Sequence, residues 1–518
     1  MDYLRLVLTV FSLVLVSALW KLFQFLIWRP YAVTRFFAKQ GIRGPPYAVL
    51  SGSLPEIKKL KKEGRNMVLD LNSHDITPKV LPHYLKWTSE YGKPFLYWYG
   101  TDPRICITDP ELAKQVLSNK FGFYTKPRIN PTVIAMIGRG LALITGMDWV
   151  KHRRVVNPAF NTDKLKVMTK RMAACTLSTL QGWEHQLVCS KDHCKEIDIR
   201  REFQILTGDI IAHTAFGSSY LEGKAVFETQ RELQPYALAS VTDIYIPGRQ
   251  YIPTWSNRQT WKLDWKIRTT VRSIVESRLK KGEESGYGDD LLGLLMGVSE
   301  TASVKQADMK LNMHEIIEEC KTFYFAGHET TSNLLTWTVF LLCLHPEWQK
   351  RLREEVLKEC GSEVPDAETL NRLKQVNMVI LEVLRLYCPV ISLVRVASED
   401  MKLGELMIPK DTMVAIPLAM IHRSKTQWGE DANEFNPRRF SDGVSKAAKH
   451  PNALLAFSVG PRACIGQNFA MMEAKLVIAL ILQRFSFSLS STYIHAPVDN
   501  LTLQPQFGLP VVLKSLGV

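Results

Sequence analysis

The sequence predicts a mainly α-helical fold with small β-sheets, preceded by one N-terminal transmembrane helix. Apolar residues recur at helical spacing over most of the chain, extended runs are short and scattered, and the N-terminus is almost wholly apolar. With 518 residues, of which 46% are hydrophobic and 22% charged, the composition is that of a globular protein with a sizeable core.

The N-terminal run from Leu4 to Trp28 contains only two charged residues, Arg5 and Lys21. Its length is close to the ~20 residues that a bilayer-spanning helix requires. No Ala-x-Ala-like cleavage site follows, so we expect an uncleaved anchor and not a removed signal peptide. Basic residues gather after the run, which predicts a cytosolic C-terminal side. A buried core helix is disfavoured, because such a helix rarely stays apolar all round.

The chain is expected to have three parts. Residues 1–28 form the anchor, and residues 29–47 form a basic flank and a stiff hinge with the sequence "GIRGPPY". Residues 48–518 contain no repeat, low-complexity tract or Gly/Ser linker. We therefore predict one large catalytic domain, although length alone suggests about three domains of ~150 residues.

Charge and cysteine content narrow the function classes. The net charge of +14 suits anionic lipid or an acidic protein, and no nucleic-acid-binding motif is present. Nine cysteines at scattered spacings form no disulfide framework. A local group, "HQLVCSKDHC", contains His185, Cys189, His193 and Cys194. It lacks a CxxC pair, so a surface loop is favoured over a zinc site.

Helical patterns begin near residues 289, 311, 347, 377 and 469, and extended runs begin near residues 401, 412 and 509. The segment 312–345 predicts a helix roughly 50 Å long that crosses the whole domain. Its middle, "AGHETT" from Ala326 to Thr331, contains a glycine and two hydroxyls that weaken a helix. A local defect is expected there. His328 and Glu329 are no zinc-protease motif, because Ser332 stands where the second histidine would be.

The stretch "FSVGPRACIGQNF" places Cys464 just before a predicted helix. A helix N-terminus and a nearby cation lower the pKa of a thiol, as a metal-binding thiolate requires. Gly460 and Gly466 allow a tight turn and the approach of a flat ligand. Arg462 predicts an anionic partner and Phe457 an aromatic wall. These residues favour a planar, carboxylate-bearing metal cofactor over a bare ion.

This stretch matches the haem-thiolate signature Phe-x-x-Gly-x-Arg-x-Cys-x-Gly, so the chain resembles the cytochromes P-450. Three further motifs extend the resemblance over nearly the whole chain: "EVLR", "NPRRF" and "WVKHR". The resemblance implies haem b (iron protoporphyrin IX) with Cys464 as the axial ligand of the haem iron. It also implies a buried lock formed by Glu382, Arg385 and Arg439. Arg438 departs from the glutamate that the family often has there, which puts the outer part of that network in doubt.

Other roles also follow from the resemblance. Trp149, Arg153 and Arg462 resemble donors to the haem propionates, and Arg395 resembles another. Glu329 and Thr330 resemble the acid and the alcohol of a proton relay beside the haem.

The resemblance implies a membrane-bound monooxygenase that hydroxylates a hydrophobic small molecule. Because the chain has no nicotinamide or flavin motif, electrons are expected from an NADPH-dependent cytochrome reductase at the endoplasmic reticulum membrane. We expect this reductase to dock near Lys151, His152, Arg153 and Arg154. A haem-thiolate isomerase or dehydratase and a non-catalytic haem-binding carrier are the alternatives.

The substrate is expected to contact residues 121–137, 232–254, 323–326, 390–393 and 506–509. These segments are largely apolar, which favours a hydrophobic substrate. The stretches "SNKFGFYTK" and "HPNALLAFS" look like the plant clan of secologanin synthase, cytokinin hydroxylase and brassinosteroid-inactivating hydroxylases. A terpenoid, hormone or fatty acid is therefore the expected substrate.

Overall fold

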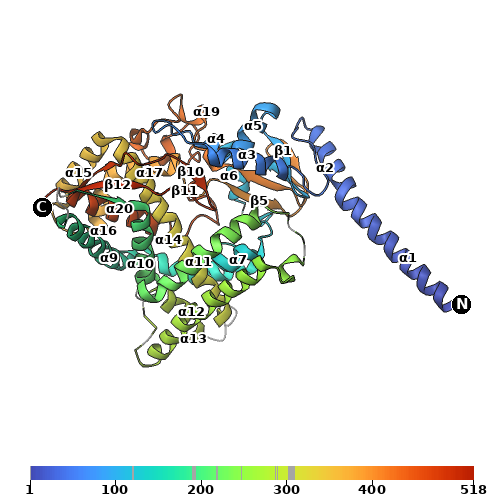
Figure 1. Ribbon diagram of the computed structural model, residues 1–518, viewed down its shortest axis with the longest axis horizontal. Coiled ribbons are helices and arrows are strands. Elements are labelled where there is room, and N and C mark those ends of the chain that lie inside the picture. The colour runs from blue at the N-terminus through green and yellow to red at the C-terminus, as the bar shows by residue number, and fades with distance from the viewer. Residues whose placement is uncertain are drawn as a thin grey trace.

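The N-terminal helix extends away from the rest of the protein in the computed structural model (Figure 1). The structure describes residues 2–119, 122–189, 194–217, 220–244, 246, 248–285, 287–288, 290–301 and 310–517. Helix α1 (Asp2–Phe23) continues through a π-helical segment (Gln24–Trp28) into α2 (Arg29–Ala38). Residues 3–38 are long and apolar enough to cross a membrane, and the most apolar part of this stretch is not buried.

The predicted hinge after this helix packs against the body. Phe37 and Ile42 are buried beside strand residues such as Leu96 and Ile105. The backbone N–H of Leu96 donates to the carbonyl of Arg43 at 2.9 Å. The far end of the anchor helix is thus attached to the body on the side of β1 and β5 (Figure 1).

Helices form most of the body, as predicted. In chain order the helices of its first half are α3 (Leu54–Asn66), α4 (Thr77–Val80), α5 (Pro82–Tyr91), α6 (Pro110–Leu117), α7 (Pro131–Ile137), α8 (Gly146–Val156), α9 (Thr162–Val188), α10 (Ile199–Ala215), α11 (Tyr220–Val241) and α12 (Trp255–Ser285). Those of the second half are α13 (Leu291–Thr301), α14 (Met313–Leu344), α15 (Pro346–Cys360), α16 (Ala367–Arg372), α17 (Lys374–Leu386), α18 (Leu418–Ile421), α19 (Lys425–Trp428) and α20 (Gln467–Arg484).

The strands form small sheets, which also agrees with the prediction. They are β1 (Phe95–Tyr99), β2 (Asp102–Cys106), β3 (Tyr124–Thr125), β4 (Cys194–Asp198), β5 (Leu393–Ala397), β6 (Met401–Leu403), β7 (Leu406–Ile408), β8 (Met413–Ile416), β9 (Phe485–Leu489), β10 (Pro497–Asp499), β11 (Leu503–Pro505) and β12 (Pro510–Ser515). The largest sheet has the order β1-β2-β8-β5-β3, in which β2 and β8 are parallel. The others have the orders β4-β12-β9, β10-β11 and β6-β7.

Helix α14 runs through the middle of the body (Figure 1). It begins at a capping box in which Asn312 and Glu315 exchange hydrogen bonds. Its second half is buried almost completely, as the fully buried Leu335, Phe340 and Leu341 show. The helix is continuous through "AGHETT", so the expected local defect is absent from its secondary structure. Gly327 lies so close to Ile211 that an added Cβ would clash, so a small residue is required at this point of the helix.

Candidate functional site

Cys464 lies in a tight loop that ends at the start of α20. The N–H of Ala463 donates to the Gly460 carbonyl at 3.0 Å, and that of Cys464 to the Phe457 carbonyl at 2.9 Å. Gly460 has a φ of +78°, and a Cβ there would stand 2.5 Å from the Leu117 carbonyl oxygen. A side chain at this position would therefore displace the loop. At Gly466, by contrast, a Cβ would meet no atom nearer than the Phe160 ring at 4.0 Å.

The Cys464 thiol does not have the lowered pKa that the sequence predicts. Burial raises the pKa of this thiol, although the N–H of Gly466 and the charge of Arg153 lower it. The helix terminus and the cation thus act in the expected direction, but desolvation is the larger effect. Cys464 is nevertheless an exposed residue, whereas Cys320 and Cys388 are buried. A bound metal would supply the remaining driving force for deprotonation.

Three cations near this loop lack carboxylate partners. Burial lowers the pKa of Arg395, on β5, to about 10. Burial and the charge of Arg395 lower the pKa of Arg462 to about 10. Burial, Arg395 and Arg462 together lower the pKa of Lys126 to about 7. Among the described residues no ion pair to a carboxylate is formed by any of the three. This cluster fits a ligand that brings carboxylates, as haem does with its two propionates.

Helix α8 places Trp149 and Arg153 beside the Cys464 loop. The Arg462 guanidinium lies over the Trp149 ring at 4.7 Å from its centroid and donates to the Ile144 carbonyl at 2.9 Å. Arg153 donates to the Ala463 carbonyl at 3.1 Å. The structure thus brings together the predicted residues Trp149, Arg153, Arg462 and Cys464.

The four residues predicted to form a docking face on α8 differ in exposure: His152 is buried, Lys151 and Arg153 are half-buried, and Arg154 is exposed. His152 is buried and forms a short contact with the buried carboxylate of Glu319. Lys151 donates to both carboxylate oxygens of Glu315 at 3.0 Å. Burial lowers the pKa of His152, but Glu319 and Glu315 outweigh this effect and raise it overall. These two side chains attach α8 to α14, and Arg154 stays exposed.

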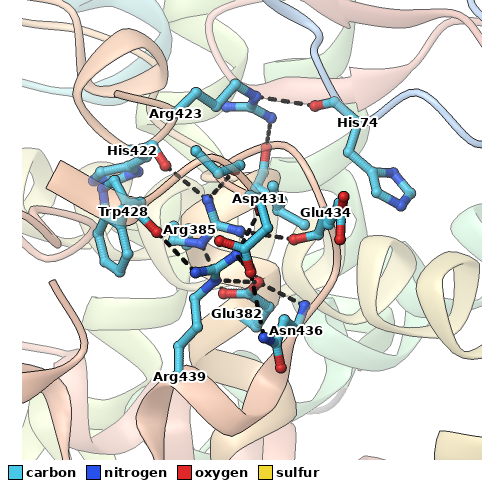
Figure 2. A network of polar contacts seen from close by, with 12 residues as sticks. His74, Glu382, Arg385, His422, Arg423, Trp428, Asp431, Glu434, Asn436 and Arg439 are labelled. Atoms are coloured by element: carbon cyan, nitrogen blue, oxygen red, sulfur yellow. Dashed lines mark hydrogen bonds and ion pairs between the residues drawn. The ribbon is translucent and has the colours of Figure 1, made fainter. Parts of the chain in front are cut away.

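Figure 2 shows a buried network around Glu382 and Arg385, which lie one turn apart on α17. Both side chains are fully buried, and Arg385 donates to the two carboxylate oxygens of Glu382 at 2.7 Å each. Arg385 also donates to the carbonyls of His422, Ala432 and Glu434. The N–H of Asn436 donates to Glu382 at 2.9 Å. The pair therefore joins α17 to the loop that follows α19.

Arg439 enters this network mainly through Asp431, which the sequence analysis did not identify (Figure 2). It pairs with the Asp431 carboxylate at 2.5 Å and donates to the carbonyls of Trp428 and Asp431. Its Nε lies 3.5 Å from Glu382 without a hydrogen bond. Burial raises the pKa of Asp431, but the hydrogen bond and charge of Arg439 outweigh this and lower it.

Glu329 and Thr330 point into different surroundings on α14. The buried Glu329 carboxylate accepts from Thr502 at 2.8 Å and from Asn333 at 3.3 Å. Thr330 is half-buried and donates to the Ala326 carbonyl at 2.7 Å. Ala326 itself is exposed although it lies in the middle of a buried helix. No direct contact between the Glu329 and Thr330 side chains occurs among the interactions of the described residues.

Phe160 connects the Cys464 loop with α14, and the sequence analysis missed it. Its ring stacks on Phe323 at 5.8 Å and meets the edge of Phe469 at 6.4 Å. Phe323 precedes Ala326 by one turn, and Phe469 lies in the first turn of α20. The position of Lys126 beside Arg395 and Arg462 was missed too, although Lys126 lies in the predicted substrate segment 121–137. Neither residue belongs to a sequence motif, so only the structure could identify them.

A cavity of about 1190 Å³ opens on the other side of α14. Its lining includes Phe325, His328 and Glu329 of α14, together with parts of α3, α10 and α11 and residues 497–506. Three of the predicted substrate segments, 232–254, 323–326 and 506–509, contribute to it. The lining is more charged than expected, because eight of its residues are Lys or Arg.

The His-Cys group after α9 forms no metal cluster in the part of the chain that the structure describes. His193 lies outside the described residues, and Cys189 is exposed. Within the described ranges, the metal-compatible group that does occur comprises Cys175, Asp209 and His213, whose ligand atoms lie within 4.8 Å of one another.

Comparison with known proteins places this geometry in context. A family model described as "Cytochrome P-450" matches residues 71–511. Cytochrome P-450 709B1 of Arabidopsis thaliana is 54% identical over 99% of this chain and 98% of its own length. Secologanin synthase 1 of Catharanthus roseus is 42% identical over 98% of this chain and 97% of its own length. Cytochrome P-450 734A1 of Arabidopsis thaliana is 40% identical, with coverages of 98% and 96%.

Proposed function

Because this chain belongs to the cytochrome P-450 family, we propose that it hydroxylates a hydrophobic small molecule with O2 and electrons from an NADPH-dependent cytochrome reductase. The chain is a monooxygenase of the plant type. We take its substrate to be a terpenoid, a hormone or a fatty acid. We take its electron donor to be the NADPH-dependent cytochrome reductase.

The cofactor proposal rests on the residues around the Cys464 loop. An exposed cysteine stands in a glycine-bounded loop, and three cations near it have no carboxylate partners among the described residues. We propose haem b as the group that fits this site, with Cys464 as its axial ligand. When bound, haem supplies the iron at which oxygen is activated. Trp149, Arg153, Arg395 and Arg462 would hold its propionates, and Phe457 would lie beside it.

Residues of α14 would leave room beside the helix and would hold or exchange protons. Ala326 leaves room beside the helix, and the hydroxyl of Thr330 would hold a proton on that side. Glu329, which faces the charged cavity, would exchange protons with solvent. The buried contacts of Glu382, Arg385 and Arg439 keep the segment before the Cys464 loop in place without touching the substrate.

The helix over residues 3–38 supports a membrane location. We propose that it spans the endoplasmic reticulum membrane once, with the catalytic domain in the cytosol. For the reductase contact we propose the exposed Arg154 in place of the four-residue face expected from the sequence. An Arg154→Glu variant is expected to be reduced more slowly, and an unchanged reduction rate would contradict this docking position.

The deciding experiment is turnover of microsomal protein with reductase, NADPH and O2 against a panel of terpenoid acids, fatty acids and hormones. A hydroxylated product that requires NADPH is expected. Equal product without NADPH would instead support an isomerase or dehydratase. The carbon monoxide difference spectrum of the reduced protein tests the ligand separately, because Cys464→Ser is expected to lose the thiolate-type band.

A further inference from the structure

The cavity beside α14 has a surplus of positive charge that its own acidic residues do not neutralise. Its lining contains eight Lys or Arg residues and four Asp or Glu residues. Two of the four acids pair with cavity lysines, Asp499 with Lys61 at 3.5 Å and Glu228 with Lys224 at 3.7 Å. The Asp198 carboxylate accepts backbone N–H groups of Arg200 and Leu509.

The lining contains four arginines, which are Arg65 of α3, Arg200 and Arg201 of α10 and Arg231 of α11. None of them forms an ion pair with a carboxylate of the described chain. The Nε of Arg200 is buried and has no hydrogen-bond partner. Burial lowers the pKa of Arg200, and the charge of Glu329 only partly offsets this. Arg200 is half-buried, and its buried Nε–H is an unused hydrogen-bond donor, which costs free energy unless an anion from outside accepts from it.

The remaining lining is apolar enough to hold more than a small ion. Apolar side chains that line the cavity include Phe227 and Leu238 of α11, Phe325 of α14 and Val498 of β10. The volume of about 1190 Å³ exceeds what an inorganic anion requires and is sufficient for a drug-sized organic molecule. The cavity thus combines an apolar wall with unpaired arginines.

We propose that this cavity binds a hydrophobic carboxylic acid, with its carboxylate on Arg200 and Arg231 and its apolar part against Phe227, Leu238 and Phe325. The site is separate from the one proposed for haem and oxygen, because Ala326, Thr330 and Cys464 do not line it. It adjoins Glu329, so a bound carboxylate shares Arg200 with the acid of α14. Three of the predicted substrate segments contribute to this cavity, and the proposal concerns only the binding of a carboxylic acid there, not its hydroxylation.

The test uses the full-length, haem-containing protein in phosphatidylcholine nanodiscs at neutral pH. Equilibrium dialysis measures binding of dodecanoate and of dodecanol, which has the same chain length without the charge. Dodecanoate is expected to bind at least about tenfold more tightly, because hydrogen bonds to charged groups are the stronger ones. Equal binding of the two probes would overturn the proposal.

Two double variants test whether Arg200 and Arg231 cause the preference for dodecanoate over dodecanol. Arg200→Gln with Arg231→Gln is expected to weaken dodecanoate binding by about tenfold or more while dodecanol binding stays unchanged. Arg200→Lys with Arg231→Lys keeps the charge and is expected to retain most of the preference. The matched control, Lys262→Gln with Arg272→Gln, removes the same charge from exposed positions of α12 outside the cavity. If the control loses as much affinity as the cavity variant, general surface charge explains the preference and the proposal fails.

A further arm distinguishes a free acid from a membrane lipid. Replacing part of the phosphatidylcholine with phosphatidylserine is expected to leave dodecanoate binding unchanged. If phosphatidylserine abolishes it, the arginines bind a lipid headgroup and the assignment to a free carboxylic acid is wrong.

Discussion

Two groups of buried charge lie in different parts of this protein and differ in how they are neutralised. The hydrogen-bond donors of Arg385 and both carboxylate oxygens of Glu382 find their partners on the chain itself. The cluster of Lys126, Arg395 and Arg462 has no carboxylate partner among the described residues. Burial lowers the pKa of all three groups, and neighbouring positive charge lowers it further for Lys126 and Arg462. The ion pair of Glu382 and Arg385 holds parts of the fold together. The cations of the second cluster, which lack a carboxylate partner among the described residues, are available to bind an anionic ligand.

The largest loss of stability is expected when one partner of the Glu382–Arg385 ion pair is removed. Glu382→Leu leaves the fully buried Arg385 without its carboxylate, which is expected to cost about 3–5 kcal/mol of unfolding free energy. Urea unfolding of the full-length protein measures this loss. Glu382→Gln keeps an acceptor for Arg385 and for the N–H of Asn436, so it is expected to cost less. A Leu variant as stable as the wild type would remove the contrast between the two groups.

In the cluster of Lys126, Arg395 and Arg462, removing one cation is expected to stabilise the haem-free protein. In haem-free protein, Lys126→Met removes a buried cation and is expected to stabilise the fold by about 2 kcal/mol at acidic pH, after discounting for partial exposure. Because the folded pKa lies near 7 and the unfolded one near 10.5, the unfolded chain binds more protons between these values. Wild-type stability therefore rises with pH over this window, and the benefit of the substitution disappears above it.

Thermal unfolding of haem-free protein at several pH values measures this effect. Lys280→Met, at an exposed position of α12, is the control and is expected to show no such pH dependence. In haem-containing protein the same Lys126→Met substitution is expected to speed haem loss. A Lys126→Met variant that is destabilised at acidic pH without haem would show that Lys126 is satisfied by the chain.

His152 tests an intermediate case, a buried cation that is paired within the chain. His152→Gln is expected to cost about 1–3 kcal/mol, because a hydrogen bond to the charged Glu319 is lost. The folded pKa is raised, so the contribution is complete below the unfolded value near 6.5 and is lost as pH rises through the folded one. Unfolding at about pH 6 and about pH 9 compares the two states. An equal cost at both values would contradict a charged His152.

The smallest effect is expected at the edge of the paired network. Asp431→Asn is expected to cost about 0.5 kcal/mol at neutral pH, because this carboxylate is partly exposed to solvent. Its pKa is lowered in the folded state, so its contribution exists above about pH 4 and is lost as pH falls through the folded value. Asp442→Asn, at an exposed position, serves as the control. If both variants lose the same stability, Arg439 does not depend on Asp431.

Sequence patterns predicted the elements that extend over many residues. The membrane helix, the long α14 and the helices that follow it have periodicities that local sequence determines. Motif residues such as Cys464, Glu382 and Arg385 were also identifiable, because their spacing carries chemical meaning. Asp431, Lys126 and Phe160 were not, since each meets its partners only through tertiary contacts between distant segments. The direction of the Cys464 pKa shift was predicted wrongly, and the burial of His152 was not foreseen, because both depend on packing against other elements.

The length of the N-terminal helix has a consequence for the proposed membrane anchor. Its 36 residues would measure roughly 54 Å at 1.5 Å per residue, whereas a bilayer core is about 30 Å thick. The excess length reaches the body, where Phe37 and Ile42 are buried. If the helix spans a membrane as proposed, a domain joined in this way would keep one side toward the lipid surface. Molecules dissolved in the bilayer, and partners that diffuse in its plane, would then meet the same side at every encounter.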